Sequence, residues 1–378
     1  MITGIDITKC TGCGTCVEVC PLDTLRLDPS VYNRPPCRGA CPAGVPIREY
    51  ICLVAEGRLE EAGRLIREAL PFPAITGRIC FHPCESACAR QSVDESVNIN
   101  ALERFVGDRR LGERASPEPS LHAAKVAVFG SGPAGLSAAY FLAKMGYRVT
   151  VFEATRKLGG SLRTKVPETR LPRNVIDSQV KYIRQMGVEF RTSKALGKEL
   201  SLDGPDALKD AGYSVLFVAT GTLPIGLSRA TREHLTSADV ETFQACIPHI
   251  FVGGALALGK VPLVKVIAAA RQAALSITRF LGHGEEGARE RPAVENLPGR
   301  DMDKKPREKS KGLWTPDMAE REASRCLHCG ARACIAYPDD CMTCFECELE
   351  CPSRAINVHP FKEEFPPTID YSKVGKAG

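Results

Sequence analysis

The stretch KVAVFGSGPAGLSAAYFLAKMGYRVTVFE, residues 125–153, decides the fold at the centre of this 378-residue chain. It begins and ends with apolar runs typical of buried strands, and a helical pattern lies between them. The helix opens with Gly130, Gly132 and Gly135 in the spacing GxGxxG, and the second strand ends at Glu153. Such glycines let a pyrophosphate approach the helix N-terminus, while the acidic residue binds a ribose hydroxyl pair. The sequence therefore predicts a Rossmann-like unit that binds a dinucleotide.

Eighteen cysteines lie mostly outside this unit. Only Cys246 falls between Cys88 and Cys326, so the chain has cysteine-rich ends and a cysteine-poor centre. The N-terminus shows no basic segment followed by an apolar core, and the chain has no run of about 18 apolar residues. We therefore expect a cytoplasmic chain without a membrane span, in which cysteines bind metal rather than form disulfides.

The first and last cysteine clusters share the spacing C-x2-C-x2-C-x3-C-P. The first contains Cys10, Cys13, Cys16 and Cys20, and the last contains Cys341, Cys344, Cys347 and Cys351. Bacterial ferredoxins bind [4Fe-4S] clusters with this spacing, and in two-cluster ferredoxins the fourth cysteine of each run binds the other cluster. Two arrangements stay open. Either the chain ends meet and exchange Cys20 and Cys351, or each end binds one cluster with its own four cysteines.

A second type of cysteine cluster lies within residues 34–110, where apolar residues recur at helical spacing over 47–55 and 59–70. We expect its cysteines on loops between short helices. They are Cys37, Cys41, Cys80, Cys84 and Cys88. The sequences CRGACP and FPAITGRICFHPCESAC make this segment resemble the N-terminal iron–sulfur module of the glutamate synthase small subunit and of dihydropyrimidine dehydrogenase.

The resemblance implies two [4Fe-4S] clusters in this module. The implied ligands are Cys41, Cys84, Cys88 and Glu103 for one cluster, and Cys37 and Cys80 with two cysteines of an upstream RCLxC segment for the other. No such pair precedes Cys37 here, but REASRCLHCGARACIAYP at 321–338 is similar to that segment. We expect Cys326 and Cys329 to replace the missing pair, with Cys334 competing with Cys37 for one place. The alternative, that these three tail cysteines bind a cluster of the tail itself, stays open.

The residues after the glycine-rich helix extend the resemblance to the flavin domain of the same family. RKLGGSLRTKVPETRLP at 156–172, the strand that ends in ATG and the segment IFVGGALALG match the family's FAD-binding sequence. The resemblance implies FAD as the bound dinucleotide. The implied binding residues are Gly130, Gly132, Pro133, Ala134, Gly135, Glu153, Gly159, Gly160, Ala219, Thr220, Gly221, Gly253 and Gly254.

Two departures from the family bear on function. Gly221 and Gly253 are separated by 31 residues, which is too few for the inserted NADPH-binding domain, because one βαβ unit alone needs about 30 residues. We therefore expect no NADPH site in this chain. Ala255 replaces the family's aspartate after the paired glycines. An empty flavin fold that serves only as a scaffold therefore stays open beside FAD binding.

The expected fold class is multidomain α/β plus α. The expected segments are a ferredoxin-like segment at 1–33, a helical iron–sulfur module at 34–118, a Rossmann-like FAD domain without the inserted NADPH domain at 119–282, a charged and solvated linker at 283–316, and a C-terminal iron–sulfur segment at 317–378. Sixteen cysteines lie in motifs, enough for up to four clusters, while Cys52 and Cys246 are interpreted as buried structural thiols. His82 and His328 lie beside cluster cysteines and are expected to tune a cluster rather than bind iron.

These features predict an electron-transfer subunit that relays electrons between iron–sulfur clusters and FAD. No catalytic residue is assigned, because no Ser/His/Asp or paired-carboxylate pattern stands out. The expected partner is a larger catalytic oxidoreductase subunit, a ferredoxin or both. Nucleic acid is not expected, because no aromatic residues interleave with the basic residues at 304–311. The alternatives are a free-standing ferredoxin-dependent flavoprotein reductase and a cluster-bearing scaffold.

Overall fold

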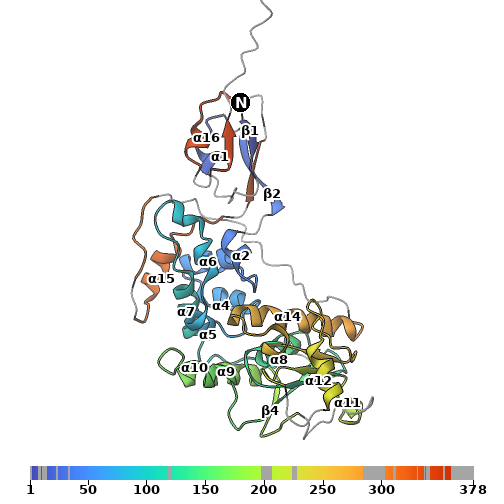
Figure 1. The fold of residues 1–378 in the computed structure, drawn as a ribbon. Coiled ribbons are helices and arrows are strands. Elements are labelled where there is room, and N and C mark those ends of the chain that lie inside the picture. The colour runs from blue at the N-terminus through green and yellow to red at the C-terminus, as the bar shows by residue number, and fades with distance from the viewer. Residues whose placement is uncertain are drawn as a thin grey trace, which may run out of the picture. The chain divides into compact units, whose positions relative to one another are not determined.

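The computed structural model divides the chain into two compact units (Figure 1). One unit comprises Pro36–His328, and the other joins the two chain ends, Met1–Pro35 and Cys329–Gly378. The structure describes residues 2–6, 10, 15–22, 24–32, 35–117, 121–196, 207–223, 228–283, 303–309, 312–329, 331–335, 337, 341–351 and 354–358.

The larger unit contains a parallel five-stranded sheet in the order β5-β4-β3-β6-β7. The strands are β3 (Lys125–Phe129), β4 (Arg148–Glu153), β5 (Glu189–Thr192), β6 (Val215–Val218) and β7 (Ile250–Val252). Val126 and Val128 face one apolar core, and Ala127 and Phe129 face the other, so β3 is buried on both sides. The strand order reverses between β3 and β6, which is where Rossmann-like sheets bind ligands. The predicted Rossmann-like unit is therefore present.

Helices cover this sheet. They are α8 (Pro133–Lys144), α9 (Ser161–Thr164), α10 (Arg173–Gln185), α11 (Ala207–Asp210), α12 (Arg229–Thr236), α13 (Ala255–Leu258) and α14 (Leu263–Phe280). The glycine-rich turn leads directly into α8, and α14 packs against α8. Between Gly221 and β7 the described residues form α12, and Gln244 makes one isolated bridge with Phe251 of β7. No helix in the described part of the chain is long and apolar enough to cross a membrane.

A helical module precedes the sheet in the same unit. It contains α2 (Pro36–Ala40), α3 (Ile47–Ala55), α4 (Leu59–Arg67), α5 (Pro73–Ile79), α6 (Pro83–Ser86), a 3-10 helix (Ala89–Ser92) and α7 (Ile99–Arg109). The two helices predicted at 47–55 and 59–70 are confirmed, although the second ends three residues early. The expectation that all cysteines of the module lie on loops is wrong, because Cys37 lies in α2 and Cys84 in α6.

The chain returns to this module after the sheet domain. Helix α15 (Pro316–Ala323) packs against α3 and α7. Residues 303–309 also contact the module: the Lys305 amide donates to Asp94 Oδ2 at 3.0 Å, and Arg307 pairs with Glu85 at 2.7 Å. Residues 303–309 are therefore docked on the module, while residues 284–302 and 310–311 of the predicted linker lie outside the described residues. The larger compact unit ends at His328, and Cys329 begins the C-terminal part of the smaller unit.

The two chain ends form the smaller unit together. Strand β1 (Ile2–Ile5) pairs antiparallel with β9 (Ile356–Val358), and β2 (Leu25–Tyr32) pairs antiparallel with β8 (Ala331–Ile335). Helix α1 (Thr15–Val19) contacts α16 (Glu346–Leu349). Ile2, Leu25 and Ile356 share one apolar core with Cys16, Cys347 and Cys351. The chain ends therefore meet in one unit, as the first of the two arrangements requires, while the exchange of Cys20 and Cys351 stays a prediction.

This pairing predicts that the substitution Ile356→Asp destabilises the smaller unit without destabilising the larger one. Ile356 is 3% exposed, so an aspartate there buries an unpaired charge and destabilises the unit by roughly 3 kcal/mol or more. Differential scanning calorimetry should show one transition lowered, while the transition of Pro36–His328 stays in place. Asn357→Asp is the control, because this neighbouring side chain is exposed. Equal lowering of every transition by Ile356→Asp would contradict the division into two units.

Candidate cofactor sites

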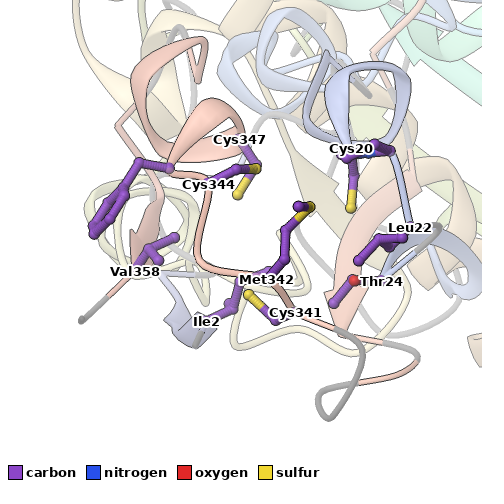
Figure 2. A pocket seen from close by; sticks show the side chains of 11 residues that line it. Ile2, Cys20, Leu22, Thr24, Cys341, Met342, Cys344, Cys347 and Val358 are labelled. Carbon is purple, nitrogen blue, oxygen red and sulfur yellow. The ribbon is translucent and has the colours of Figure 1, made fainter. Parts of the chain in front are cut away.

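Four cysteines from both chain ends line one cavity of the smaller unit. They are Cys20, Cys341, Cys344 and Cys347. Figure 2 shows their side chains around the cavity. The cavity contains about 310 Å³ of space free of atoms, part of which is open to solvent. Ile2, Leu22 and Val358 give the cavity an apolar border. The cavity thus brings one cysteine of the N-terminal run to three of the C-terminal run.

The thiols at this cavity affect one another. Burial and, to a smaller extent, the other three thiols raise the pKa of Cys347 to about 11. At Cys20 burial alone would raise the pKa, but hydrogen bonds from Leu22, Thr24 and Leu25 outweigh it and lower the pKa. Four thiolates in one place need positive charge, which the irons of a cluster supply. The residues therefore fit a [4Fe-4S] cluster with Cys20 as the exchanged fourth ligand.

The remaining ferredoxin-type cysteines lie in the same unit. Cys16 and Cys351 are both buried in its core, and Cys10 packs against that core. The Ala355 amide donates to Cys351 Sγ at 3.3 Å, a contact that stabilises a thiolate. Cys13 lies outside the described residues.

In the helical module, Cys41, Cys80, Cys84 and Glu103 form one group. Burial raises the pKa of Cys84 strongly, and Glu103, Cys41 and Cys80 raise it further. Burial likewise raises the pKa of Glu103 to about 7, although the Thr76 hydroxyl donates to its Oε1 and opposes the shift. Three thiols and one carboxylate therefore lie close enough together to raise the pKa of Cys84. This group fits a cluster with an oxygen ligand from Glu103.

Cys88 belongs to a different group. Burial raises the pKa of Cys326 to about 12, and the Cys88 and Cys52 thiols contribute to that shift. The pKa shifts thus associate Cys80, and not Cys88, with Cys41 and Glu103, whereas the resemblance implied Cys88 in that place; the ligand set itself stays a prediction. The physical reason is helix packing: α5 and α7 lie together, which brings Cys80, directly after α5, to the carboxylate carried by α7.

Three cysteine loops share a backbone turn. His82, His328 and Thr343 each lie two residues after a cysteine and have left-handed φ values of 50°, 47° and 59°. The turn directs the amide back to sulfur: the His82 amide lies 3.5 Å from Cys80 Sγ, and the His328 amide bonds to Cys326. Such strained turns persist at functional sites, and amide–sulfur hydrogen bonds tune cluster potentials. Both histidines therefore act on sulfur through their backbone amides.

The other cysteines have mixed outcomes. Cys52 is fully buried as expected, and its Sγ lies 3.4 Å from Glu56 Oε1. The prediction that Cys246 is buried is wrong, because it lies exposed in the turn before β7. The roles of Cys329, which begins the smaller unit, and of Cys334 in β8 stay predictions. Within the described ranges, no three His, Cys, Asp or Glu side chains are arranged to hold a single metal ion.

The predicted ribose-binding carboxylate lies at the switch point of the sheet. Glu153 Oε2 accepts from the Ser131 amide at 2.9 Å and from its hydroxyl at 2.6 Å. Oε1 accepts from the Thr155 amide at 2.9 Å. Burial would raise the pKa of Glu153, but these hydrogen bonds outweigh it and lower the pKa. An ionised carboxylate is therefore held beside the glycine-rich turn, where a ribose diol needs an acceptor.

The glycine-rich turn leaves room for a phosphate. A Cβ on Gly135 would lie 1.8 Å from the Gly130 carbonyl oxygen, whereas a Cβ on Gly132 would meet nothing within 4 Å. Backbone atoms therefore fill the space beside Gly135. The space beside Gly132 is open in front of α8, whose N-terminus attracts anions.

The other predicted dinucleotide residues border this turn or end neighbouring strands. Ala219–Gly221 follow β6, and Gly253 and Gly254 follow β7. Gly159 and Gly160 reach the turn directly, since the Gly159 amide donates to Ser131 Oγ at 3.1 Å. Parallel strands end at one edge of a sheet, so these segments meet at the switch point. The residues present fit a bound dinucleotide.

Several residues of these sites were missed by the sequence reasoning. Ser131 and Thr76 support Glu153 and Glu103, and Arg90, Asp94 and Arg325 connect the neighbourhoods of Cys88 and Cys326. Two signals were available. Ser131 lies inside the GxGxxG motif, and Arg325 directly precedes the cysteine of the RCLxC segment.

The sites define an iron–sulfur protein with a Rossmann-like dinucleotide-binding domain. Comparison with protein families agrees at the level of domains. Residues 31–115 match the dihydropyrimidine dehydrogenase domain II, 4Fe-4S cluster family; residues 128–196 match an NAD(P)-binding Rossmann-like domain; and residues 3–26 match a 4Fe-4S binding domain. The resemblance of the helical module to dihydropyrimidine dehydrogenase is thus confirmed.

Curated relatives are subunits of oxidoreductases. The chain is 36% identical over 210 residues to the NADP(+)-dependent formate dehydrogenase subunit beta of Moorella thermoacetica, which covers 49% of this chain and 29% of the relative. It is 38% identical over 192 residues to the NADPH-Fe(3+) oxidoreductase subunit beta of Geobacter sulfurreducens, and the match covers 49% of this chain and 28% of that relative. It is 31% identical over 245 residues to the NAD-dependent dihydropyrimidine dehydrogenase subunit PreT of Escherichia coli, and the match covers 61% of this chain and 59% of that relative. The chain thus spans between 28% and 59% of the length of these relatives.

The contrast between two glycines predicts opposite outcomes for alanine. Gly135→Ala should lower the thermal stability of the larger unit, because its Cβ meets backbone. Gly132→Ala should leave the melting temperature within about 2 °C but lower the flavin content of the purified protein, because its Cβ enters only the open space. Calorimetry and released-flavin absorbance measure the two effects. Unchanged flavin content in a folded Gly132→Ala protein would contradict a phosphate site at this turn.

Paired cysteine variants test the exchange of ligands between the chain ends. If Cys20 and Cys344 bind one cluster, the double variant Cys20→Ala/Cys344→Ala should lose no more iron than either single variant. If Cys20 and Cys16 bind different clusters, Cys20→Ala/Cys16→Ala should lose about twice as much. Iron per chain after anaerobic purification is the measurement, and Cys246→Ala is the control. Additive loss for the first pair and non-additive loss for the second would establish that each run uses its own four cysteines.

Proposed function

We propose that this chain is an electron-transfer subunit of a multi-subunit oxidoreductase, in which up to four [4Fe-4S] clusters exchange electrons with one FAD. The observation that supports it most directly is that one chain combines a dinucleotide site with groups of thiols in both of its units. FAD supplies two-electron chemistry, and iron–sulfur clusters carry single electrons. A chain with both can convert between the two.

The proposed ligand sets follow the groups described above. They are Cys20, Cys341, Cys344 and Cys347; Cys10, Cys13, Cys16 and Cys351; Cys41, Cys80, Cys84 and Glu103; and Cys37, Cys88 and Cys326 with one further ligand.

Contacts in the larger unit support an order for two of the cofactors. Arg170, directly before α10 of the Rossmann-like domain, donates from Nε to the Arg78 carbonyl at 3.3 Å. Arg78 lies only two residues before Cys80 in the sequence, so this contact lies near the group that Cys80 forms with Cys41, Cys84 and Glu103. We infer that the cluster bound by Cys80 exchanges electrons with FAD first, and that the cluster bound by Cys88 and Cys326 follows.

Substrate chemistry is proposed to lie on a larger catalytic subunit. The names of the relatives support this, since two are beta subunits and the third is the PreT subunit of a dehydrogenase. The short connection between β6 and β7 supports the absence of an NADPH domain in this chain. A free-standing ferredoxin-dependent reductase and an assembly scaffold remain the alternatives.

Anaerobic purification tests the proposal. We expect about 16 irons and one FAD per chain, with flavin bleached by reduced ferredoxin but not by NADPH alone. The chain should also co-purify with a larger subunit from its native cells. Absence of flavin would favour the scaffold, bleaching by NADPH would contradict the missing NADPH site, and ferredoxin-linked turnover by the isolated chain would favour the reductase.

A further inference from the structure

Arg325 links the returning segment to the helical module through a buried ion network. Its guanidinium is 1% exposed, donates to Glu322 Oε1 at 2.6 Å and to Asp94 Oδ1 at 2.8 Å, and also reaches the Glu95 carbonyl at 2.5 Å. Glu322 is equally buried, and its two oxygens accept from the Asn98 and Glu308 amides at 2.7 Å.

Arg90 completes the network from the other side. It is also 1% exposed, and its Nε and Nη2 form a bidentate pair with Asp94 at 2.8 and 2.6 Å. Its Nη1 donates to the Arg325 carbonyl at 3.2 Å. Two arginines and two carboxylates are therefore locked together, with every link inside the larger unit.

The network is attached directly to two thiols of one cluster site. Arg325 immediately precedes Cys326, and Arg90 lies two residues after Cys88. The charge of Arg325 also reaches the Cys88 thiol. The other charges acting on these thiols are Arg48 from α3 and Glu85 from α6. The same contacts that position the two cysteines thus also place fixed charges beside them.

We propose that Arg325 is a positioning residue that, anchored by Asp94 and Glu322, holds Cys326 next to Cys88 and raises the reduction potential of the cluster these cysteines bind. The inference rests on the proposed function, because it requires a cluster at this site. Reduction adds one electron to the cluster from dithionite, and no bond or proton transfer is required. A fixed cation stabilises the added negative charge, whereas a fixed carboxylate opposes it.

This assignment predicts potential shifts of opposite sign within one network. Arg325→Gln should lower the midpoint potential of this cluster, while Asp94→Asn and Glu322→Gln should raise it. We expect about a tenfold change in the reduction equilibrium, which is 59 mV for a one-electron couple. Arg325→Lys keeps the cation and should restore most of the wild-type potential. A purely structural role would move all variants in the same direction.

EPR-monitored redox titration of the whole chain measures these shifts. The signal that disappears in Cys88→Ala identifies the cluster, and Arg191→Gln is the control, because Arg191 forms an exposed pair with Glu189 in β5. Same-sign shifts, or none, in variants that retain full iron would overturn the inference and leave the proposed function intact. If Cys88→Ala removes no signal, no cluster is bound by Cys88, and the inference fails together with the proposed ligand set of Cys37, Cys88 and Cys326. If Arg325→Gln does not fold, the two carboxylate variants and Arg325→Lys decide the question.

Discussion

The fold depends on bringing Ile2 opposite Val358 and Leu25 opposite Ile335. Closing a flexible loop costs only about 0.6 kcal/mol for each doubling of its length, so distance along the sequence is a small obstacle once the intervening chain is ordered. Residues 36–328 fold as their own unit, and the returning segment docks on it before the tail begins. The long excursion between the two halves of the ferredoxin-like unit is therefore occupied by a folded body rather than by loose chain.

The docking of that segment combines a buried ion network with apolar packing of Ala319 and Ala323 in α15. Arg90, Arg325 and Glu322 are buried, and burying charges is costly unless every partner is present. A network of paired charges is seldom a large source of stability, but it accepts few arrangements of its donors and acceptors. Because a cluster tolerates little error in the placement of its thiols, an arrangement that specifies one geometry suits the site better than an interchangeable apolar contact.

The sequence predicts the local parts of this structure well and the long-range parts poorly. The turn at Gly130–Gly135 is set by residues a few positions apart, and so are the ferredoxin-type runs; both are read from spacing alone. The membership of Cys80 and Cys88 in different groups depends on how α5 lies on α7 and on the ion pairs of Arg90, which no local pattern contains. Cys246 shows the same limit, because an apolar neighbourhood in sequence did not predict its exposure in the turn before β7. Pairing of the chain ends could be proposed only because two identical spacings implied a shared unit.

Bound clusters would change the net charge of the chain. The bare chain carries a net charge of +5, each cluster with four thiolates would add about −2, and the cluster that includes Glu103 would add about −1 because that carboxylate is already counted, so four clusters would bring the total to about −2. That negative charge is not evenly accessible. Among the described cysteines in cluster motifs, Cys344 is the exposed one, while Cys16, Cys84, Cys347 and Cys351 are buried. Met342 and Leu349, 60% and 76% exposed, lie in the same run as Cys344. The C-terminal run of the smaller unit thus presents an exposed thiol beside exposed apolar side chains.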